Sequence, residues 1–462
     1  MPLSTSSPEI KLTITRHIKI DPVSDEVRNE LIDLFTLPNP KWQDNERMGR
    51  WNRGIPKFLK YYRRSGKTGL IVPRGYARGL IYLCRRHKLE FELIDKRRSL
   101  EPVNFCFKGQ LRPLQQAAAD AMLAKEFGTL NAPTGSGKTI IALYMIAARH
   151  QPALIVVHTR DLALQWMDRI ESFLGIPAQE IGCIGSGKKK IGQQVTVALV
   201  QSLYKCVDET APHIGYLVVD ECHRAPSRTF TEAVSGFDCR YMTGLSATPW
   251  RRDRLSRLIF WYLGDVNHEM NKADLIESGD VLSADVIIRE TEFKPWFDPV
   301  NEYSKMLSEL TGDDKRNRLI VSDVAREVSE SNSVCLVLSD RKQHCETLAA
   351  LLKYRHHIEA AVLTGDVDIT QRRHIADQLD QGRLRVLIAT GQLVGEGFDS
   401  KNLSTLFLAT PVRFSGRLLQ YLGRILRPAP GKENARVFDY VDVHVDVLNA
   451  AACARQRVYS AS

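Results

Sequence analysis

The sequence lacks the features of a membrane protein, a secreted protein or a metal scaffold. Its nine cysteines are scattered without a Cys-x-x-Cys pair, so neither a zinc site nor a redox motif is expected. No apolar run approaches the roughly 20 residues that span a bilayer. The first residues lack the charged-then-apolar order of a signal peptide. We therefore expect a reduced, cytoplasmic globular protein whose core needs no disulfide.

Charge of one sign is concentrated in the first quarter of the chain. The net charge is +10, and residues 1–108 hold 22 Lys and Arg against 12 Asp and Glu, so the rest of the chain is neutral. Such asymmetry indicates a polyanion partner or, alternatively, a solvated basic surface. The basic residues gather in three clusters: Lys57, Lys60, Arg63 and Arg64; Arg85, Arg86 and Lys88; and Lys96, Arg97 and Arg98. Phe58, Tyr61 and Tyr62 lie among the first, where they could stack on bases or belong to the core.

Beyond residue 108, short apolar runs alternate with helical patterns. Such runs are typical of buried strands in parallel sheets with helical crossovers. The expected strands are 128–131, 153–158, 195–200, 216–220, 333–338, 360–363, 385–389 and 405–409, and the expected helices are 140–149, 161–174, 341–354 and 370–381. The pattern predicts two tandem α/β domains, residues 109–285 and 286–462, with a less regular stretch near 264–330.

The first 108 residues have a different pattern. One alternating strand is expected over residues 11–20 and a helix over residues 24–34. We therefore expect residues 1–108 to form a small, basic α+β domain ahead of the two parallel-sheet domains.

A glycine-rich segment lies between the strand at 128–131 and the helix at 140–149. Small residues let backbone N–H groups wrap phosphates, and the following helix N-terminus adds a positive dipole. Lys138 can neutralise nucleotide phosphates, and the Thr139 hydroxyl can hold Mg²⁺. Ala132 stands where the general pattern starts with Gly. The phosphate-loop residues are Thr134, Gly135, Ser136, Gly137, Lys138 and Thr139.

Two adjacent acids end the strand expected at 216–220. Buried neighbouring carboxylates are costly without a cation, and Mg²⁺ offsets that cost. We expect Asp220 to hold Mg²⁺ through water and Glu221 to polarise the water that attacks ATP.

The order of the motifs resembles that of superfamily 2 helicases of the DExH type. Residues 220–223 (DECH) are a variant of the DExH box, and residues 245–249 (LSATP), 390–399 and 420–427 resemble motifs III, V and VI. Residues 111–115 (LRPLQ) and 250–253 (WRRD) resemble the xeroderma pigmentosum group B and restriction-type branch, and the chain also resembles phage branch-migration helicases. This resemblance implies two RecA-like domains with ATP between them, favours DNA over RNA, and implies a bacterial or phage-infected host cell.

The resemblance also assigns roles to single residues. Arg424 and Arg427 are implied to act as arginine fingers, and Ser246 and Thr248 to couple the nucleotide site to the strand site. The implied nucleotide contacts are Arg112, Gln115 and Gln420, with Glu396 and Asp399 binding ribose or ordering the fingers. The implied nucleic-acid contacts are Thr159, Arg160, Gln201, Ser202, Thr364, Gly365 and Thr390. Each Thr or Ser among them could instead be an ordinary helix cap.

Two functions fit these motifs. The first is a monomeric, ATP-dependent DNA helicase or translocase that acts on forked or branched duplex. The alternative is an ATP-driven translocase subunit of a defence or restriction assembly, which does not separate strands. A clamp without turnover fits poorly because Lys138, Glu221, Arg424 and Arg427 are all present.

Overall fold

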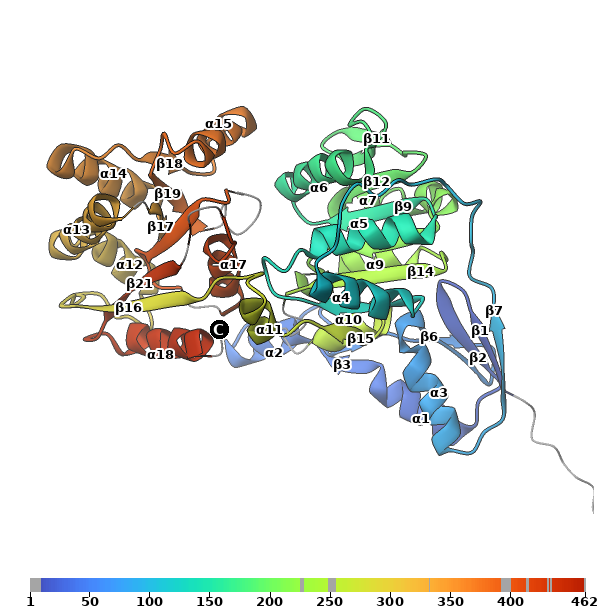
Figure 1. The fold of residues 1–462 in the computed structure, drawn as a ribbon. Helices are drawn as coiled ribbons and strands as arrows, with labels where there is room; N and C mark the ends of the chain where they lie inside the picture. Colours follow the sequence, from blue (N-terminus) through green and yellow to red (C-terminus); the bar gives the residue numbers. More distant parts are fainter. Residues whose placement is uncertain are drawn as a thin grey trace, which may run out of the picture. The chain divides into compact units, whose positions relative to one another are not determined.

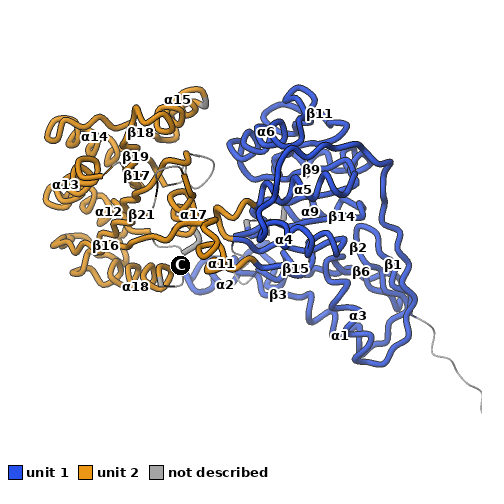
Figure 2. The backbone as a smooth tube through the Cα atoms, in the orientation of Figure 1, with its two compact units in different colours: residues 1–132, 138–269 blue, residues 133–137, 270–462 orange. Residues whose placement is uncertain are grey.

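The computed structural model describes residues 10–224, 228–247, 255–331, 333–391, 400–412, 415–429, 432 and 434–460. The chain divides into two compact units (Figure 2): unit 1 comprises residues 1–132 and 138–269, and unit 2 comprises residues 133–137 and 270–462. Each unit contains one large parallel sheet covered by helices (Figure 1). The two α/β sheets expected from the sequence are therefore confirmed. Among the described helices, none combines the length and apolar character needed to cross a membrane.

Unit 1 begins with a small mixed sheet in the order β5-β6-β2-β1-β7. Its strands are antiparallel except for the parallel pair β1–β7. They are β1 (Ile10–Ile14), β2 (His17–Asp21), β5 (Arg63–Ser65), β6 (Gly69–Pro73) and β7 (Phe91–Asp95). The accompanying elements are α1 (Asp25–Leu34), β3 (Thr36–Pro38), α2 (Pro40–Arg47), β4 (Phe58–Lys60), which pairs with β3, and α3 (Ala77–Arg86). The helix expected over residues 24–34 is confirmed as α1, and Ser24 is its N-cap.

The single strand expected over residues 11–20 is wrong, because this segment is the hairpin β1–β2. Ile14 faces Ile18 across the turn in the antiparallel register. The two residues are an even number of positions apart. Apolar residues therefore recur at every second position on both sides of the turn, as they would in one continuous strand. The alternation therefore continues although the chain reverses direction.

The second sheet of unit 1 has the strand order β11-β10-β12-β9-β13-β14-β8-β15, and only the β10–β11 pair is antiparallel. Its strands are β8 (Phe127–Asn131), β9 (Ala153–Val157), β10 (Gly182–Gly185), β11 (Lys188–Lys190), β12 (Val195–Leu199), β13 (Tyr216–Val219), β14 (Tyr241–Ser246) and β15 (Val266–Glu269). The helices are α4 (Pro113–Leu123), α5 (Lys138–Arg149), α6 (Arg160–Leu174), α7 (Val200–Leu203), α8 (Val207–Thr210), α9 (Arg228–Ser235) and α10 (Ser256–Leu263). The central strands β9 and β13 are buried throughout, which explains their unbroken apolar sequences.

The two sheets of unit 1 are joined by a shared apolar core. Leu258 and Trp261 of α10 are buried in the same cluster as the inward residues of the small sheet. The ring of Trp261 lies 4.7 Å from that of Phe35, between centroids. Arg74 is 3% exposed and donates to the carbonyl oxygen of Cys239 at 2.7 Å. The N-terminal region therefore packs on the large sheet as part of one folded body.

Unit 2 has six parallel strands in the order β16-β21-β20-β17-β19-β18. They are β16 (Ala284–Thr291), β17 (Val334–Ser339), β18 (Ala361–Leu363), β19 (Val386–Thr390), β20 (Leu403–Leu408) and β21 (Ala435–Asp442). The described helices are α11 (Lys272–Glu277), α12 (Tyr303–Gly312), α13 (Asp314–Glu330), α14 (Lys342–His356), α15 (Ile369–Asp380), α17 (Ser415–Ile425) and α18 (Asp446–Ser460).

The stretch near 264–330 is more regular than the sequence pattern indicates. It contains β15, α11, β16, α12 and the long helix α13. Helix α13 buries Arg316, Asp323 and Glu327, so charged residues occupy positions where apolar ones are expected. Arg316 pairs with Asp442 at 2.9 Å, and both side chains are 1% exposed. Burial with a partner explains why the apolar periodicity is weak here.

Candidate active site

The phosphate loop connects β8 to α5, as expected from the sequence. Its start is fixed by a hydrogen bond from the backbone N–H of Ala132 to the carbonyl of Ser246 at 2.9 Å. Gly135 and Gly137 have φ values of +93° and +88°, a region that favours glycine. The ammonium group of Lys138 donates to the carbonyl of Ala132 at 2.8 Å and so folds back across the loop. A narrow glycine turn with a lysine over it fits a phosphate cradle.

Asp220 follows β13 and is held by two donors. The indole Nε1 of Trp166 donates to its Oδ2 at 2.8 Å, and the backbone N–H of Glu221 donates to its Oδ1 at 2.8 Å. Burial, followed by the charge of Glu221, raises the pKa of Asp220 to about 6. The raised pKa means that the charged form of Asp220 is unfavourable in these surroundings. A cation bound beside the carboxylate would offset that cost. Sequence reasoning missed Trp166, whose only signal is a tryptophan on the inner face of a helix.

Glu221 starts a chain of contacts that leads to motif III. Its backbone has φ +48°, which turns it out of the strand direction. Its Oε2 lies 3.1 Å from Nδ1 of His223, and the same Nδ1 lies 3.1 Å from Oγ of Ser246. The structure thus brings the DExH box and Ser246 together. Thr248, Glu396 and Asp399 lie outside the described residues.

The expected adenine element lies at the start of α4. Gln115 is 6% exposed, and its side-chain oxygen accepts from the backbone N–H of Arg112 at 3.1 Å. Gln115 therefore has a capping role at this helix end. The Arg112 side chain is exposed. These contacts leave the adenine assignment as a prediction.

The unit 1 residues expected to contact nucleic acid follow the neighbouring strands β9 and β12. Thr159 caps α6 by accepting from the backbone N–H of Leu162 at 3.3 Å. This is the helix-cap role given above as the alternative to a nucleic-acid contact. Arg160 and Gln201 are exposed, and Gln201 donates to the carbonyl of His158 at 3.2 Å. Ser202 is half-buried. Carboxyl ends of parallel strands share one edge of a sheet, so these residues lie at the edge that also carries Asp220.

In unit 2, the expected strand contacts also lie at one carboxyl edge. Thr364 follows β18 and Thr390 ends β19, and these strands pair with Leu363 opposite Ala389. Thr364 is buried, whereas Gly365 is exposed.

The motif VI residues lie on and after helix α17. Gln420 and Arg424 are one turn apart on α17 and only 9% and 8% exposed. Arg427 follows the helix and is half-buried. The spacing of the motif therefore places its polar residues along one side of the helix end.

The first N-terminal basic cluster is on the surface, but its aromatics are divided. Lys57, Lys60, Arg63 and Arg64 are exposed, as is Phe58. Tyr61 and Tyr62, by contrast, pack against the shared core of unit 1, and the ring of Tyr61 lies 5.7 Å from that of Trp261. The core alternative therefore holds for both tyrosines.

Three residues of the other two basic clusters are paired with carboxylates of the protein. Arg97 pairs with Asp95 at 2.7 Å and also contacts Glu126, and its side chain is 5% exposed. Arg98 pairs with Asp238 at 2.5 Å, and Arg86 pairs with Glu30. Interpreting Arg97 as part of an open basic surface is therefore wrong, because it joins β7 to the start of β8.

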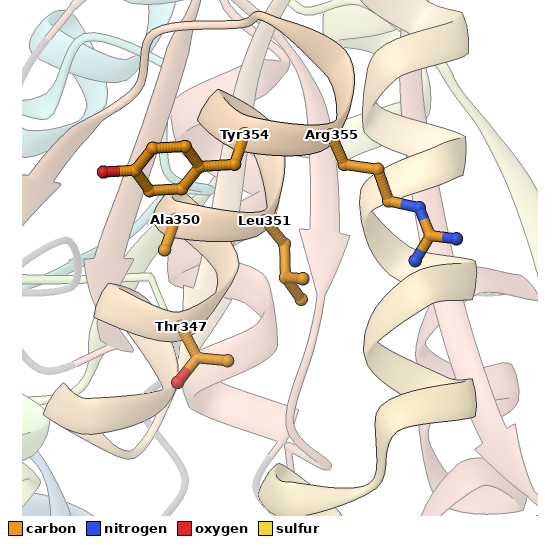
Figure 3. Close-up of a pocket in the computed structure, with 5 residues that line it drawn as sticks. All are labelled: Thr347, Ala350, Leu351, Tyr354 and Arg355. Atoms are coloured by element: carbon orange, nitrogen blue, oxygen red, sulfur yellow. The ribbon is translucent and has the colours of Figure 1, made fainter.

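A shallow pocket on unit 2 involves none of the motif residues. Figure 3 shows its five lining side chains along α14: Thr347, Ala350, Leu351, Tyr354 and Arg355. They present a mainly apolar hollow without a convergent set of polar groups, so it has no catalytic chemistry of its own.

The comparisons with known proteins agree with this geometry. The family described as "Type III restriction enzyme, res subunit" matches residues 108–251, and "Helicase conserved C-terminal domain" matches residues 316–429. A protein of Acanthamoeba polyphaga mimivirus named "Putative ATP-dependent RNA helicase L396" is 27% identical over 97% of this chain and 85% of its own length. The ATP-dependent DNA helicase uvsW of Enterobacteria phage T4 is 24% identical over 92% of this chain and 89% of its own length.

A solved structure supports the fold. The structure of S. cerevisiae Dbp5 bound to RNA and ADP BeF3 aligns with this chain with a TM-score of 0.55 at 15% identity. The alignment covers 76% of this chain and 88% of the Dbp5 chain. Both sheets are therefore RecA-like. The two family models match in order along the chain, and a relative named an ATP-dependent DNA helicase aligns with 92% of it. The protein belongs to the superfamily 2 helicases of the DExH type and is an ATP-dependent helicase.

Proposed function

We propose that this helicase acts on DNA, and that it couples ATP hydrolysis to strand separation or branch migration on forked or branched duplex. The observation that carries the proposal is the shared carboxyl edge of the large sheet in unit 1. Asp220 follows β13 at this edge, Arg160 follows its neighbour β9, and Gln201 follows β12, the next strand beyond β9. This arrangement supports placing hydrolysis and strand contact on adjacent strands, and His223 lies between Glu221 and Ser246.

In this proposal each motif residue has one task. Lys138 and the loop N–H groups hold the phosphates, and Glu221 orients the attacking water. Asp220 and Thr139 are the groups suited to hold Mg²⁺, which would neutralise charge on the phosphates. Arg424 and Arg427 stabilise the charge that develops on the transferred phosphoryl group.

The names of the relatives favour DNA as the substrate, although one of them names RNA instead. The T4 relative is named a DNA helicase, whereas the mimivirus relative is named an RNA helicase. The test is strand displacement on forked, blunt and four-way DNA, with forked RNA of the same sequence beside them. We expect ATP-dependent separation of forked and four-way DNA. Equal or better separation of RNA would contradict the DNA assignment.

The alternative, a translocase that leaves the duplex intact, is separated from the proposal by a triplex substrate. Displacement of a third strand without duplex opening would favour a motor subunit of a defence or restriction assembly. Sedimentation of the same sample tests the expected monomeric state.

The pH dependence of magnesium use tests the role of Asp220. Because its pKa is raised to about 6, protons compete with the cation as the pH falls through 6. We expect the Mg²⁺ concentration for half-maximal ATPase to rise steeply between about pH 7 and 5.5. Excess Mg²⁺ should restore the rate. A rate loss at pH 5.5 that no Mg²⁺ concentration restores would argue against this assignment.

The same pKa shift also makes the free energy of unfolding depend on pH. A carboxyl whose folded pKa lies above its ordinary value favours folding most when protonated. The metal-free protein should therefore gain stability from Asp220 as the pH falls through about 6.

We also propose that Lys57, Lys60, Arg63 and Arg64 hold the duplex next to the fork. Substitution of all four by Ala should weaken binding to forked DNA about tenfold at moderate salt and make its salt dependence shallower. Fluorescence anisotropy at several salt concentrations measures both.

Surface substitutions are preferable to removal of residues 1–107, because truncation would expose Leu258 and Trp261. The comparator is Arg85→Ala with Lys88→Ala, which removes exposed charge elsewhere in the same region. Equal effects of the two variants would indicate general charge rather than a binding site.

A further inference from the structure

A basic hairpin extends the large sheet of unit 1 at its edge. β10 and β11 pair with Gly185 opposite Lys188 and Ile184 opposite Lys189. Their two-residue turn consists of Ser186 and Gly187, with φ values of 52° and 80°. Positive φ at both positions is the turn geometry that suits a tight hairpin. Both turn residues and all three lysines of β11 are exposed.

The tip of this hairpin lies at the carboxyl edge of the sheet. β10 runs parallel to β12, with Ile184 opposite Ala198, so the two strands end at the same level. Helix α7, which carries Gln201 and Ser202, packs against β10. Figure 1 shows β11 at the same end of unit 1 as β12, and β10 lies between the two strands in the sheet. The lysines are therefore placed beside the strand contacts expected from motifs.

Three neighbouring strands at this edge are each followed by an exposed cation. In the sheet order β10-β12-β9, these are Lys188, Lys205 and Arg160. Within the described part of the chain, Lys189 pairs with Glu209, while Lys188 enters no ion pair. Lys188 thus offers its charge to a ligand.

We propose that the β10–β11 hairpin grips the phosphodiester backbone of the DNA strand on which the motor moves, with Lys188 as its contact. This inference rests on the proposed DNA function and adds a binding element to it. A strand-separating wedge needs a bulky side chain to insert between bases. Ser186 and Gly187 are too small for that, but they let backbone N–H groups approach a phosphate closely. The hairpin is therefore suited to hold a strand rather than to split a duplex.

The test is binding of oligo(dT) by Lys188→Ala in the full chain. We expect affinity to fall about threefold to tenfold at low salt, and the slope of log affinity against log salt to lose about 0.7, the value for one phosphate on a single strand. The oligo(dT) concentration for half-maximal ATPase stimulation should rise by the same factor. Lys188→Arg keeps the charge and should retain most of the slope.

The matched control is Lys125→Ala. Lys125 is also an exposed lysine of unit 1, but it precedes β8 and so lies at the amino edge of the sheet. If Lys188→Ala and Lys125→Ala show the same affinity and slope, the hairpin has no strand contact. If the unsubstituted chain itself fails to bind oligo(dT), both the proposed DNA function and this inference are wrong. If the unsubstituted chain binds and Lys188→Ala binds equally well, only the inference about the hairpin is wrong.

Discussion

Glu221→Gln should hydrolyse ATP at least about a hundredfold more slowly than the unsubstituted protein while still binding it. A positioned base typically contributes about 10²–10⁴ to a rate, and Gln cannot accept the proton. The amide has nearly the same size, so the turn at φ +48° and the neighbourhood of His223 are preserved. Multiple-turnover ATPase with excess DNA and equilibrium binding of labelled ATP measure the two quantities.

The control for this variant is Glu171→Gln, which makes the same chemical change at an exposed position of α6. It should hydrolyse ATP at the ordinary rate. DNA-stimulated turnover close to normal in Glu221→Gln would remove Glu221 from the reaction. Loss of ATP binding together with turnover would instead indicate that the residue shapes the site.

Arg427→Ala should lower DNA-stimulated turnover by about 10³ or more, because an arginine finger contributes about 10³–10⁵ by stabilising transition-state charge. ATP affinity should change little, since the contact strengthens only as the phosphoryl group is transferred. Arg427 is a better target than Arg424, which is only 8% exposed and would leave a gap at the end of α17.

Two further variants separate a finger from a general cation. Arg427→Lys should remain strongly impaired, because an ammonium group lacks the forked donor geometry of a guanidinium. Arg417→Ala removes an exposed arginine of α17, the helix that Arg427 follows, and is the control for charge and folding. A large rise in the ATP dissociation constant with normal turnover at saturation would contradict the role of Arg427.

Much of the fold was open to prediction because its central strands are buried on both faces. A strand such as β9 has no polar side, so its sequence is an apolar run bounded by loop residues. The phosphate loop and the DExH box were equally readable, because their chemistry depends on neighbours in the chain. Trp166, which holds Asp220 from a different element, was not readable in this way.

The two mistakes about charged residues share a physical cause, which is partners remote in sequence. Arg316 is buried on α13 because Asp442 of β21 and the carbonyl of Ala409 accept its hydrogen bonds. Arg97 loses its surface role because Glu126 lies at the start of the large sheet. A sequence pattern shows which side chains are charged, but it does not show which distant group will pair with each charge in the folded protein.

The shared core of unit 1 has a consequence for synthesis of the chain. The small sheet is complete in sequence once β7 ends at Asp95, yet part of its apolar covering is α10, which begins at Ser256. At about 5–20 residues per second, a ribosome needs roughly 10–30 s to make the chain between them. During that interval the face that receives Trp261 is exposed on the nascent protein. Chaperones that bind apolar surfaces should therefore meet this N-terminal sheet early, and release it only when α10 has emerged and docked.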